Sequence, residues 1–167
     1  MSQQTQMLSI AHLVPYSIVF PLSRHSGRYG WMIDLVARQA ASGMHVTVYS
    51  NPASRIDIPG VTCKSVSGAF TDSASANREL LVHSLQDATI DIYHSHFDNL
   101  HYMVAGATKK PIIYTQHWWP TKETIAKAQT YEAANVWAVP PTKYMLELDR
   151  QYDIKTKGFI YHGDQPA

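Results

Sequence analysis

Apolar positions along the chain form two patterns. One is a short, nearly continuous apolar run, and the other is a longer stretch with helical spacing. Residues 7–14 are almost continuously apolar, which is typical of a strand covered on both faces of a sheet. In the stretch 31–42, Met32, Leu35 and Val36 fall on one side of a helix, and Gly43 is a natural stop. The two signatures then alternate to the end of the sequence.

This alternation predicts the order of the elements. Strands are expected at residues 7–14, 45–49, 61–66, 90–94, 111–115, 136–139 and 159–161, and helices at 31–42, 74–86, 99–108, 121–134 and 142–152. Strands that alternate with helices at this spacing need right-handed crossovers and a parallel sheet with helices on both faces. A length of 167 residues suits one domain. We therefore predict a single Rossmann-like three-layer α/β/α domain over residues 1–167, with a mainly parallel sheet.

Composition excludes some function classes and leaves others open. The net charge of +1 gives no electrostatic footprint for nucleic acid or an anionic membrane. No apolar run is long enough to span a bilayer, and residues 1–6 are polar, without the pattern of a secretory leader. The single Cys63 excludes an internal disulfide and fits a reducing compartment. We expect a cytoplasmic protein, with the Cys63 thiol packed inside a strand.

Ligands of parallel sheets bind beyond the carboxyl ends of the strands, and the first segment there is the loop at residues 15–30. Ser26 and Gly27 precede the first helix, where backbone N–H groups and the helix dipole favour an anion. The spacing is not G-x-G-x-x-G, and no acidic residue follows the second strand, so a nicotinamide cofactor is not indicated. The alternative is a turn that needs flexible residues.

The second segment contains His94 and His96, two residues apart on a predicted strand. Side chains at this spacing point to the same face, and with His101 or Asp98 they could hold a metal. No Glu and no H-E-x-x-H pattern supports zinc catalysis. We expect hydrogen-bonded histidines that line a cleft, and no metal.

The third segment, residues 115–120, reads T-Q-H-W-W-P. Indole faces suit the C–H faces of sugars and apolar acceptors, and the His117 imidazole can hydrogen-bond a hydroxyl or a phosphate. The alternative for Trp118 and for Trp119 is packing into the core. No Ser-His-Asp or Cys-His arrangement with a recognisable local context accompanies them.

Four patterns in order resemble the N-terminal domain of family 4 glycosyltransferases, which are retaining enzymes of the GT-B architecture. They are Ser26-Gly27 with the following helix, Gly43 and the strand at 46–50, then Asp91-Ile-Tyr-His-Ser-His96, Pro111-Ile-Ile-Tyr-Thr-Gln-His117 and Ile160-Tyr-His-Gly-Asp164. The resemblance covers nearly the whole chain.

The resemblance implies two Rossmann-like domains with the active cleft between them. The N-terminal domain would bind a sugar or lipid-linked acceptor, and a C-terminal domain would bind the nucleotide sugar, a co-substrate rather than a cofactor. A hexosyl-type unit would pass to a hydroxyl with retention and without an essential metal. In the family, the residue matching His117 faces the transferred sugar, and Ser26 and Gly27 approach the donor diphosphate. The acceptor side would be lined by His96, Trp118 and Trp119.

The sequence departs from the family at several points. Ser26 replaces the first glycine, Tyr29 stands where an acidic residue is common, the segment 138–142 lacks the usual serine, and Gly163-Asp164 lacks an intervening residue. The donor-binding basic residues and the E-x7-E carboxylates of a C-terminal domain do not occur in the sequence. We therefore expect the 167-residue chain to be inactive by itself and to need that domain or a partner subunit.

Functions of other classes are also considered. A stand-alone module that binds a sugar or nucleotide without catalysis is the main alternative. A small dehydrogenase is disfavoured by the missing fingerprint. A phospho-receiver domain is disfavoured because His12 and the histidines at 94, 96 and 117 stand where its carboxylates would be.

Overall fold

The computed structural model describes residues 7–23, 27–70, 72–97, 101–117, 119–131 and 135–160, and within them six strands form one sheet. The strands are β1 (Ser9–Leu13), β2 (His45–Tyr49), β3 (Val61–Lys64), β4 (Ile92–Ser95), β5 (Ile112–Thr115) and β6 (Val136–Val139). The helices are α1 (Gly27–Ala41), α2 (Ser73–Leu85), α3 (His101–Ala107), α4 (Lys122–Tyr131) and α5 (Lys143–Gln151).

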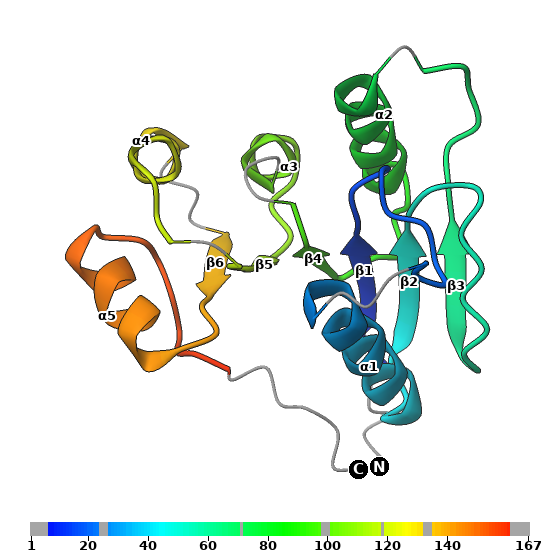
Figure 1. Ribbon diagram of the computed structural model, residues 1–167, viewed down its shortest axis with the longest axis horizontal. Helices are drawn as coiled ribbons and strands as arrows, with labels where there is room; N and C mark the ends of the chain where they lie inside the picture. Colours follow the sequence, from blue (N-terminus) through cyan, green and yellow to red (C-terminus); the bar gives the residue numbers. More distant parts are fainter. Residues whose placement is uncertain are drawn as a thin grey trace, which may run out of the picture.

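The strand order is β3-β2-β1-β4-β5-β6, and every neighbouring pair is parallel. The chain starts in the middle of the sheet, moves outward to β3, returns through α2 to β4, and then moves outward the other way (Figure 1). The order therefore reverses between β1 and β4, the point at which doubly wound sheets bind ligands. The prediction of a Rossmann-like α/β domain is confirmed.

Apolar side chains cover both faces of the sheet in two clusters. On one face, Met32 and Val36 of α1 pack on β1 and β2. On the other face, Leu80 and Leu81 of α2 and Val104 of α3 pack on the central strands. Figure 1 shows α2, α3 and α4 on the opposite side of the sheet from α1. The burial of the strands on both faces explains their near-continuous apolar sequences.

Helix α1 begins at Gly27, four residues before the predicted start at residue 31. Tyr29 is buried against the α1 face of the sheet, so packing extends the helix through Gly27 and Gly30 in spite of their low helix propensity. Gly27 therefore lies in the first turn of a helix rather than in a loop.

The predicted strand at residues 159–161 is wrong at its two described positions, since Phe159 and Ile160 belong to no strand. The N–H of Ile160 donates instead to the carbonyl of Pro140 at 3.1 Å, and the edge of β6 carries a single parallel bridge from Ala138 to Thr156. Two prolines directly follow β6 and lack the N–H groups that a longer ladder needs. Tyr161 lies outside the described residues.

Two further sequence expectations have a structural outcome. Cys63 is exposed on β3, at the end of the strand order, so the prediction of a packed thiol is wrong. An edge strand has one partner strand, and its side chains meet fewer neighbours. Across the described part of the chain, no helix combines the length and the apolar character needed to cross a membrane.

Candidate functional site

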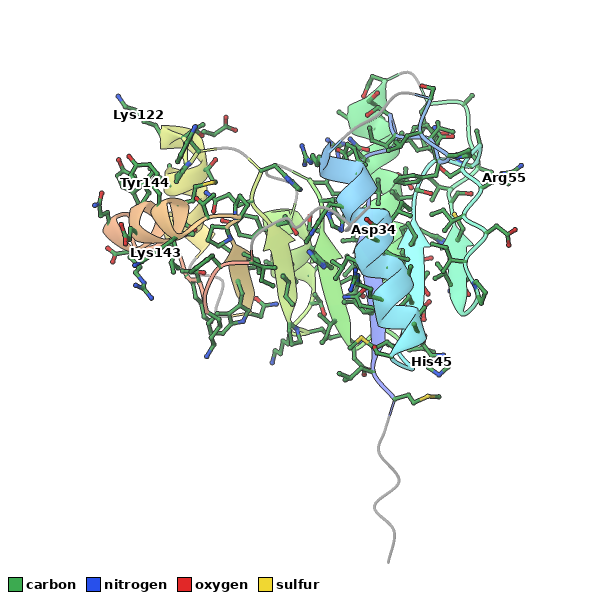
Figure 2. The ribbon with its side chains drawn as sticks, turned by 60° about the horizontal axis from the view of Figure 1, so that its bottom comes forward. Asp34, His45, Arg55, Lys122, Lys143 and Tyr144 are labelled. Atoms are coloured by element: carbon green, nitrogen blue, oxygen red, sulfur yellow. The ribbon has the colours of Figure 1, made fainter. Side chains whose placement is uncertain are left out.

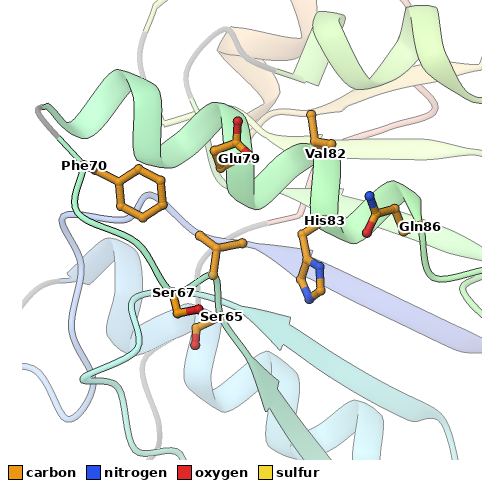
Figure 3. Close-up of a pocket in the computed structure, with 8 residues that line it drawn as sticks. Ser65, Ser67, Phe70, Glu79, Val82, His83 and Gln86 are labelled. Carbon is orange, nitrogen blue, oxygen red and sulfur yellow. The ribbon is translucent and has the colours of Figure 1, made fainter.

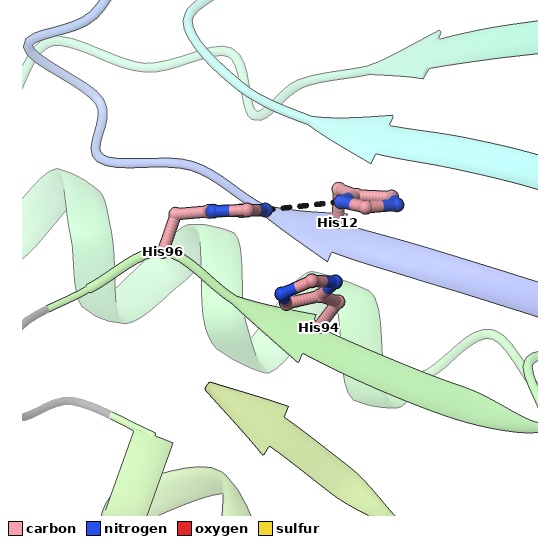
Figure 4. Close-up of side chains that lie close together, drawn as sticks. All are labelled: His12, His94 and His96. Atoms are coloured by element: carbon pink, nitrogen blue, oxygen red, sulfur yellow. Dashed lines mark hydrogen bonds between the residues drawn. The ribbon is translucent and has the colours of Figure 1, made fainter. Parts of the chain in front are cut away.

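The carboxyl ends of β1 and β4 bring three histidines together at the point where the strand order reverses (Figure 4). His12 of β1 lies opposite His94 of β4 in the parallel register. His96 follows β4 and is anchored by its N–H, which donates to the Leu13 carbonyl at 2.9 Å. All three side chains are buried, His12 and His96 completely. The expectation that His94 and His96 share a face is confirmed by this grouping.

His12 and His96 are joined by a hydrogen bond between ring nitrogens. The distance from His12 Nδ1 to His96 Nε2 is 3.0 Å, and the ring planes differ by 13°. Near-coplanar rings at this separation place the shared proton on the line between the two nitrogens. The other nitrogen of His12, Nε2, lies 2.7 Å from the side-chain oxygen of Gln39 in α1.

His94 packs on this pair without joining its hydrogen bond. Its ring centroid lies 4.9 Å from that of His12 and 4.5 Å from that of His96. Its Nε2 is 2.7 Å from the Thr115 hydroxyl at the end of β5. The cluster therefore ties α1, β1, β4 and β5 together through buried polar contacts.

Burial keeps the three imidazoles neutral. It lowers the pKa of His12 to about 4, against an opposing effect of the hydrogen bond to Gln39. Burial also holds the pKa values of His94 and His96 well below the ordinary value, and the neighbouring histidines lower both further. Each neutral ring offers one N–H donor and one acceptor nitrogen.

A metal ion bound by these three rings would compete with the hydrogen bond between two of them. One donor nitrogen from each of the three lies within 4.8 Å of the others. Zinc binds imidazole nitrogen at about 2.0–2.1 Å, and it would have to displace the proton that His12 and His96 share. The cluster as it stands is hydrogen-bonded. Of the other ligands considered from the sequence, Asp98 lies outside the described residues, and the side chain of His101 is not described.

The first turn of α1 lies beside the end of β4. The guanidinium of Arg28 donates to the His96 carbonyl and lowers the pKa of the His96 ring electrostatically. Gln39, on the same helix, reaches His12. A Cβ added to Gly27, the first residue of α1, would meet nothing within 4 Å, so its backbone faces open space. Ser26 lies outside the described residues.

The segment after β5 is divided between two environments. His117 is partly buried and lowers the pKa values of His94 and His96 electrostatically, which sets it near the cluster. Trp119 is 56% exposed and meets the ring of Tyr144 edge to face, with the centroids 5.4 Å apart. Tyr144 is 60% exposed and lies at the far end of the domain from Arg55 (Figure 2). Trp118 lies outside the described residues.

Sequence reasoning missed two polar residues of this region, Gln39 and Asp149. Gln39 lies within the predicted helix at residues 31–42, and nothing local in the sequence pairs it with His12. Asp149 is completely buried on α5, where burial raises its pKa to about 6 and the neighbouring Gln116 side chain opposes the rise. Its position four residues after the buried Met145 was the available signal.

Two hollows lie apart from the cluster. One, of about 370 Å³, is lined by the segment after β3 and by α2, with Ser67, Phe70 and His83 in its wall (Figure 3). The other, of about 420 Å³, is lined by residues that include His45 of β2 and Asp91 before β4. None of the site residues expected from the sequence lines either hollow.

Comparisons with known proteins agree with the fold. No family model matches the chain, and no curated protein matches it. Among solved structures, the chain is similar in fold to a glycosyltransferase. That structure is the glycosyltransferase from Rickettsia africae ESF-5, with a TM-score of 0.61 and 14% sequence identity over 92% of this chain. The match covers 42% of the Rickettsia chain, so this chain spans less than half of its length.

Proposed function

We propose that this chain is the acceptor-binding half of a glycosyltransferase that moves a sugar from a nucleotide-sugar donor to a hydroxyl with retention. The observation that carries the proposal is the convergence of three segments at the carboxyl edge of the sheet. They are the first turn of α1, the end of β4 and the segment after β5. The fold likeness to a glycosyltransferase supports it.

The proposal assigns a role to each segment. His117 is the catalytic residue and faces the transferred sugar. Ser26 and Gly27 approach the donor diphosphate at the N-terminus of α1, where backbone N–H groups and the helix dipole favour an anion. His96, Trp118 and Trp119 serve the acceptor, and the exposed Trp119 ring, braced by Tyr144, offers a face on which a sugar can stack.

The proposal also implies what the chain works with. A second domain or a partner subunit supplies the nucleotide-sugar site, and the isolated chain is therefore inactive in transfer. The acceptor is a sugar or a lipid-linked sugar. The proposed reaction requires no cofactor beyond the nucleotide sugar itself and no essential metal.

Replacing His117 tests the assignment. In the protein joined to its donor domain, His117→Ala is expected to lower turnover by several orders of magnitude, because a group placed against the reacting sugar acts mainly in the transition state. Thermal unfolding of the variant checks that it folds. Lys143→Ala, on the exposed side of α5, is the matched control with unchanged turnover. Full turnover in folded His117→Ala would remove His117 from the site.

A further inference from the structure

We propose that Gln39 fixes the proton positions of the His12–His96 pair, so that His96 keeps Nδ1 unprotonated as the acceptor for a hydroxyl group of a bound sugar. The hydroxyl part of this inference rests on the proposed function, and the proton positions do not. Gln39 would be a positioning residue, acting on the ligand through two imidazoles.

The direction of the two hydrogen bonds that link Gln39, His12 and His96 follows from counting donors and acceptors. The side-chain oxygen of Gln39 only accepts, so His12 must carry its proton on Nε2, 2.7 Å away. A neutral His12 then has an unprotonated Nδ1, which accepts across the 3.0 Å contact from His96 Nε2–H. A neutral His96 with its proton on Nε2 keeps a lone pair on Nδ1. One amide oxygen thus sets the tautomers of both rings.

The lone pair on His96 Nδ1 accepts no hydrogen bond from the described residues. His96 Nδ1 is buried and has no hydrogen-bond partner there. A buried polar atom left unpaired destabilises the protein, so a donor group that reaches His96 Nδ1 gains a hydrogen bond without breaking one within the protein. A hydroxyl fits this position, because it is small and donates through a proton that can rotate toward the acceptor.

The position of His96 agrees with a ligand contact. The residue directly follows β4 and is held by the Leu13 carbonyl and by Arg28 of the first turn of α1. This is the switch point of the sheet, where the N-terminus of α1 and the end of β4 meet. His94 lies outside the chain of donors, since its Nε2 is bonded to Thr115.

Nitrogen-15 NMR of the imidazole rings tests the proton positions without any activity. Protonated and unprotonated ring nitrogens have separate resonances, so spectra of the 167-residue chain at pH 8 report each tautomer. We expect protons on Nε2 of both His12 and His96. In Gln39→Met, which removes the acceptor at similar size, both rings should lose this preference and populate the Nδ1–H form.

Two variants make the comparison specific. Gln39→Glu keeps an acceptor oxygen and is expected to show the wild-type tautomers. Because this variant also replaces Gln39, it separates the loss of the acceptor from any other effect of changing the residue. Thr115→Val removes the partner of His94 alone, and should change His94 while leaving His12 and His96 as they are. A proton on His96 Nδ1 in the wild type, or unchanged tautomers in folded Gln39→Met, would overturn the inference.

The hydroxyl is tested by adding glucose, mannose and N-acetylglucosamine in turn and following the His96 Nδ1 and Trp119 indole resonances. Binding that shifts both, and that weakens severalfold in Gln39→Met, supports the inference. A sugar that shifts Trp119 and leaves His96 Nδ1 unmoved contradicts the hydroxyl role but not the proposed function. No shift at either residue with any of the three counts against the proposed function and the hydroxyl role together.

Discussion

Asp149 is a buried carboxyl on the face of α5 that points toward the segment after β5. Its pKa is raised to about 6, chiefly by burial, whereas the ordinary value for an aspartate is 3.8. The folded protein therefore binds the Asp149 proton more tightly than the unfolded chain does. Above pH 6 the fold holds a buried charge, which costs stability. As the pH falls below 6 the carboxyl protonates in the fold and the cost disappears toward pH 4.

Replacing this carboxyl tests the cost directly. Asp149→Asn keeps the shape of the side chain while removing the charge. It is expected to raise the free energy of unfolding by about 2–3 kcal/mol at pH 7.5, following about 1.4 kcal/mol per pKa unit, and by nothing near pH 4. Urea unfolding at the two pH values measures the difference. Equal effects at both would show that the charge is not what burial opposes.

Some of the site residues could be identified from local sequence and others could not. His94 and His96 were found because a spacing of two places side chains on one face of a strand. In the sequence, His12 stands only where a receiver domain would have a carboxylate. Its partnership with His96 depends on β1 and β4 being neighbours, 84 residues apart in sequence. Gln39 required the additional knowledge of which face α1 covers.

Side-chain caps fix the beginning of several helices. Asp72 accepts from the N–H of Ser75 at the start of α2, and Thr142 from Met145 at the start of α5. Thr121, directly before α4, accepts from the N–H of Thr124 at 3.1 Å. These bonds satisfy N–H groups that have no partner within the helix.

The cap of α5 matters for the site, because this helix presents Tyr144 to Trp119 and Asp149 to Gln116. Thr142→Ala is expected to lower the free energy of unfolding by about 1 kcal/mol. Chemical denaturation measures the change, with Lys143→Ala as the control, since Lys143 follows the cap and is exposed. A loss that is equal in both variants would contradict a specific role for the Thr142 hydroxyl.

Element prediction succeeded where periodicity was strong and failed where tertiary contacts decide. The strands β2 and β6 have the predicted bounds, because their apolar residues are flanked by clear breaks. The start of α1 was missed because Gly27 and Gly30 suggest a loop, and only the packing of Tyr29 shows otherwise. The strand expected around Phe159 required a partner edge that the prolines after β6 do not provide.

The molecule as a whole buries three neutral imidazoles in the middle of its sheet, and this makes its stability depend on pH. In the unfolded chain a histidine gains a proton near pH 6.5, whereas His12 in the fold does so only near pH 4. His94 and His96 are shifted in the same direction. Stability is therefore fully present above pH 6.5 and is lost as the pH falls toward 4, because the unfolded state binds more protons.

The expected loss is about 1.4 kcal/mol per histidine for each pH unit below 6.5, offset in part by Asp149. Urea unfolding at a series of pH values between 7 and 5 measures it. His94→Asn should reduce the slope by about one proton. His45→Asn, at the exposed start of β2, is the matched control for replacing a histidine outside the buried cluster. A wild-type stability that does not fall in this range would contradict the burial of neutral rings.

The fold of the whole chain followed from its alternating pattern, but the sheet order did not. Periodicity predicts strands and helices one at a time, and the reversal between β1 and β4 arises from the long return through α2. The sequence therefore predicts which segments form the site but not how the residues within a segment are oriented. One residue separates His117 from Trp119 in the sequence. His117 nevertheless lowers the pKa of the buried His96, whereas Trp119 is exposed beside Tyr144.

The most direct test of the sugar-transfer proposal is a transfer assay with a panel of nucleotide sugars. The complete reading frame of the gene would be compared with the 167-residue chain, alone and supplied with a donor domain. Transfer that requires both this chain and the donor domain, and that is lost in His117→Ala, is the predicted result. If a longer form or a reassembled pair neither transfers nor hydrolyses any donor, the transferase account is contradicted and a binding module without catalysis takes its place.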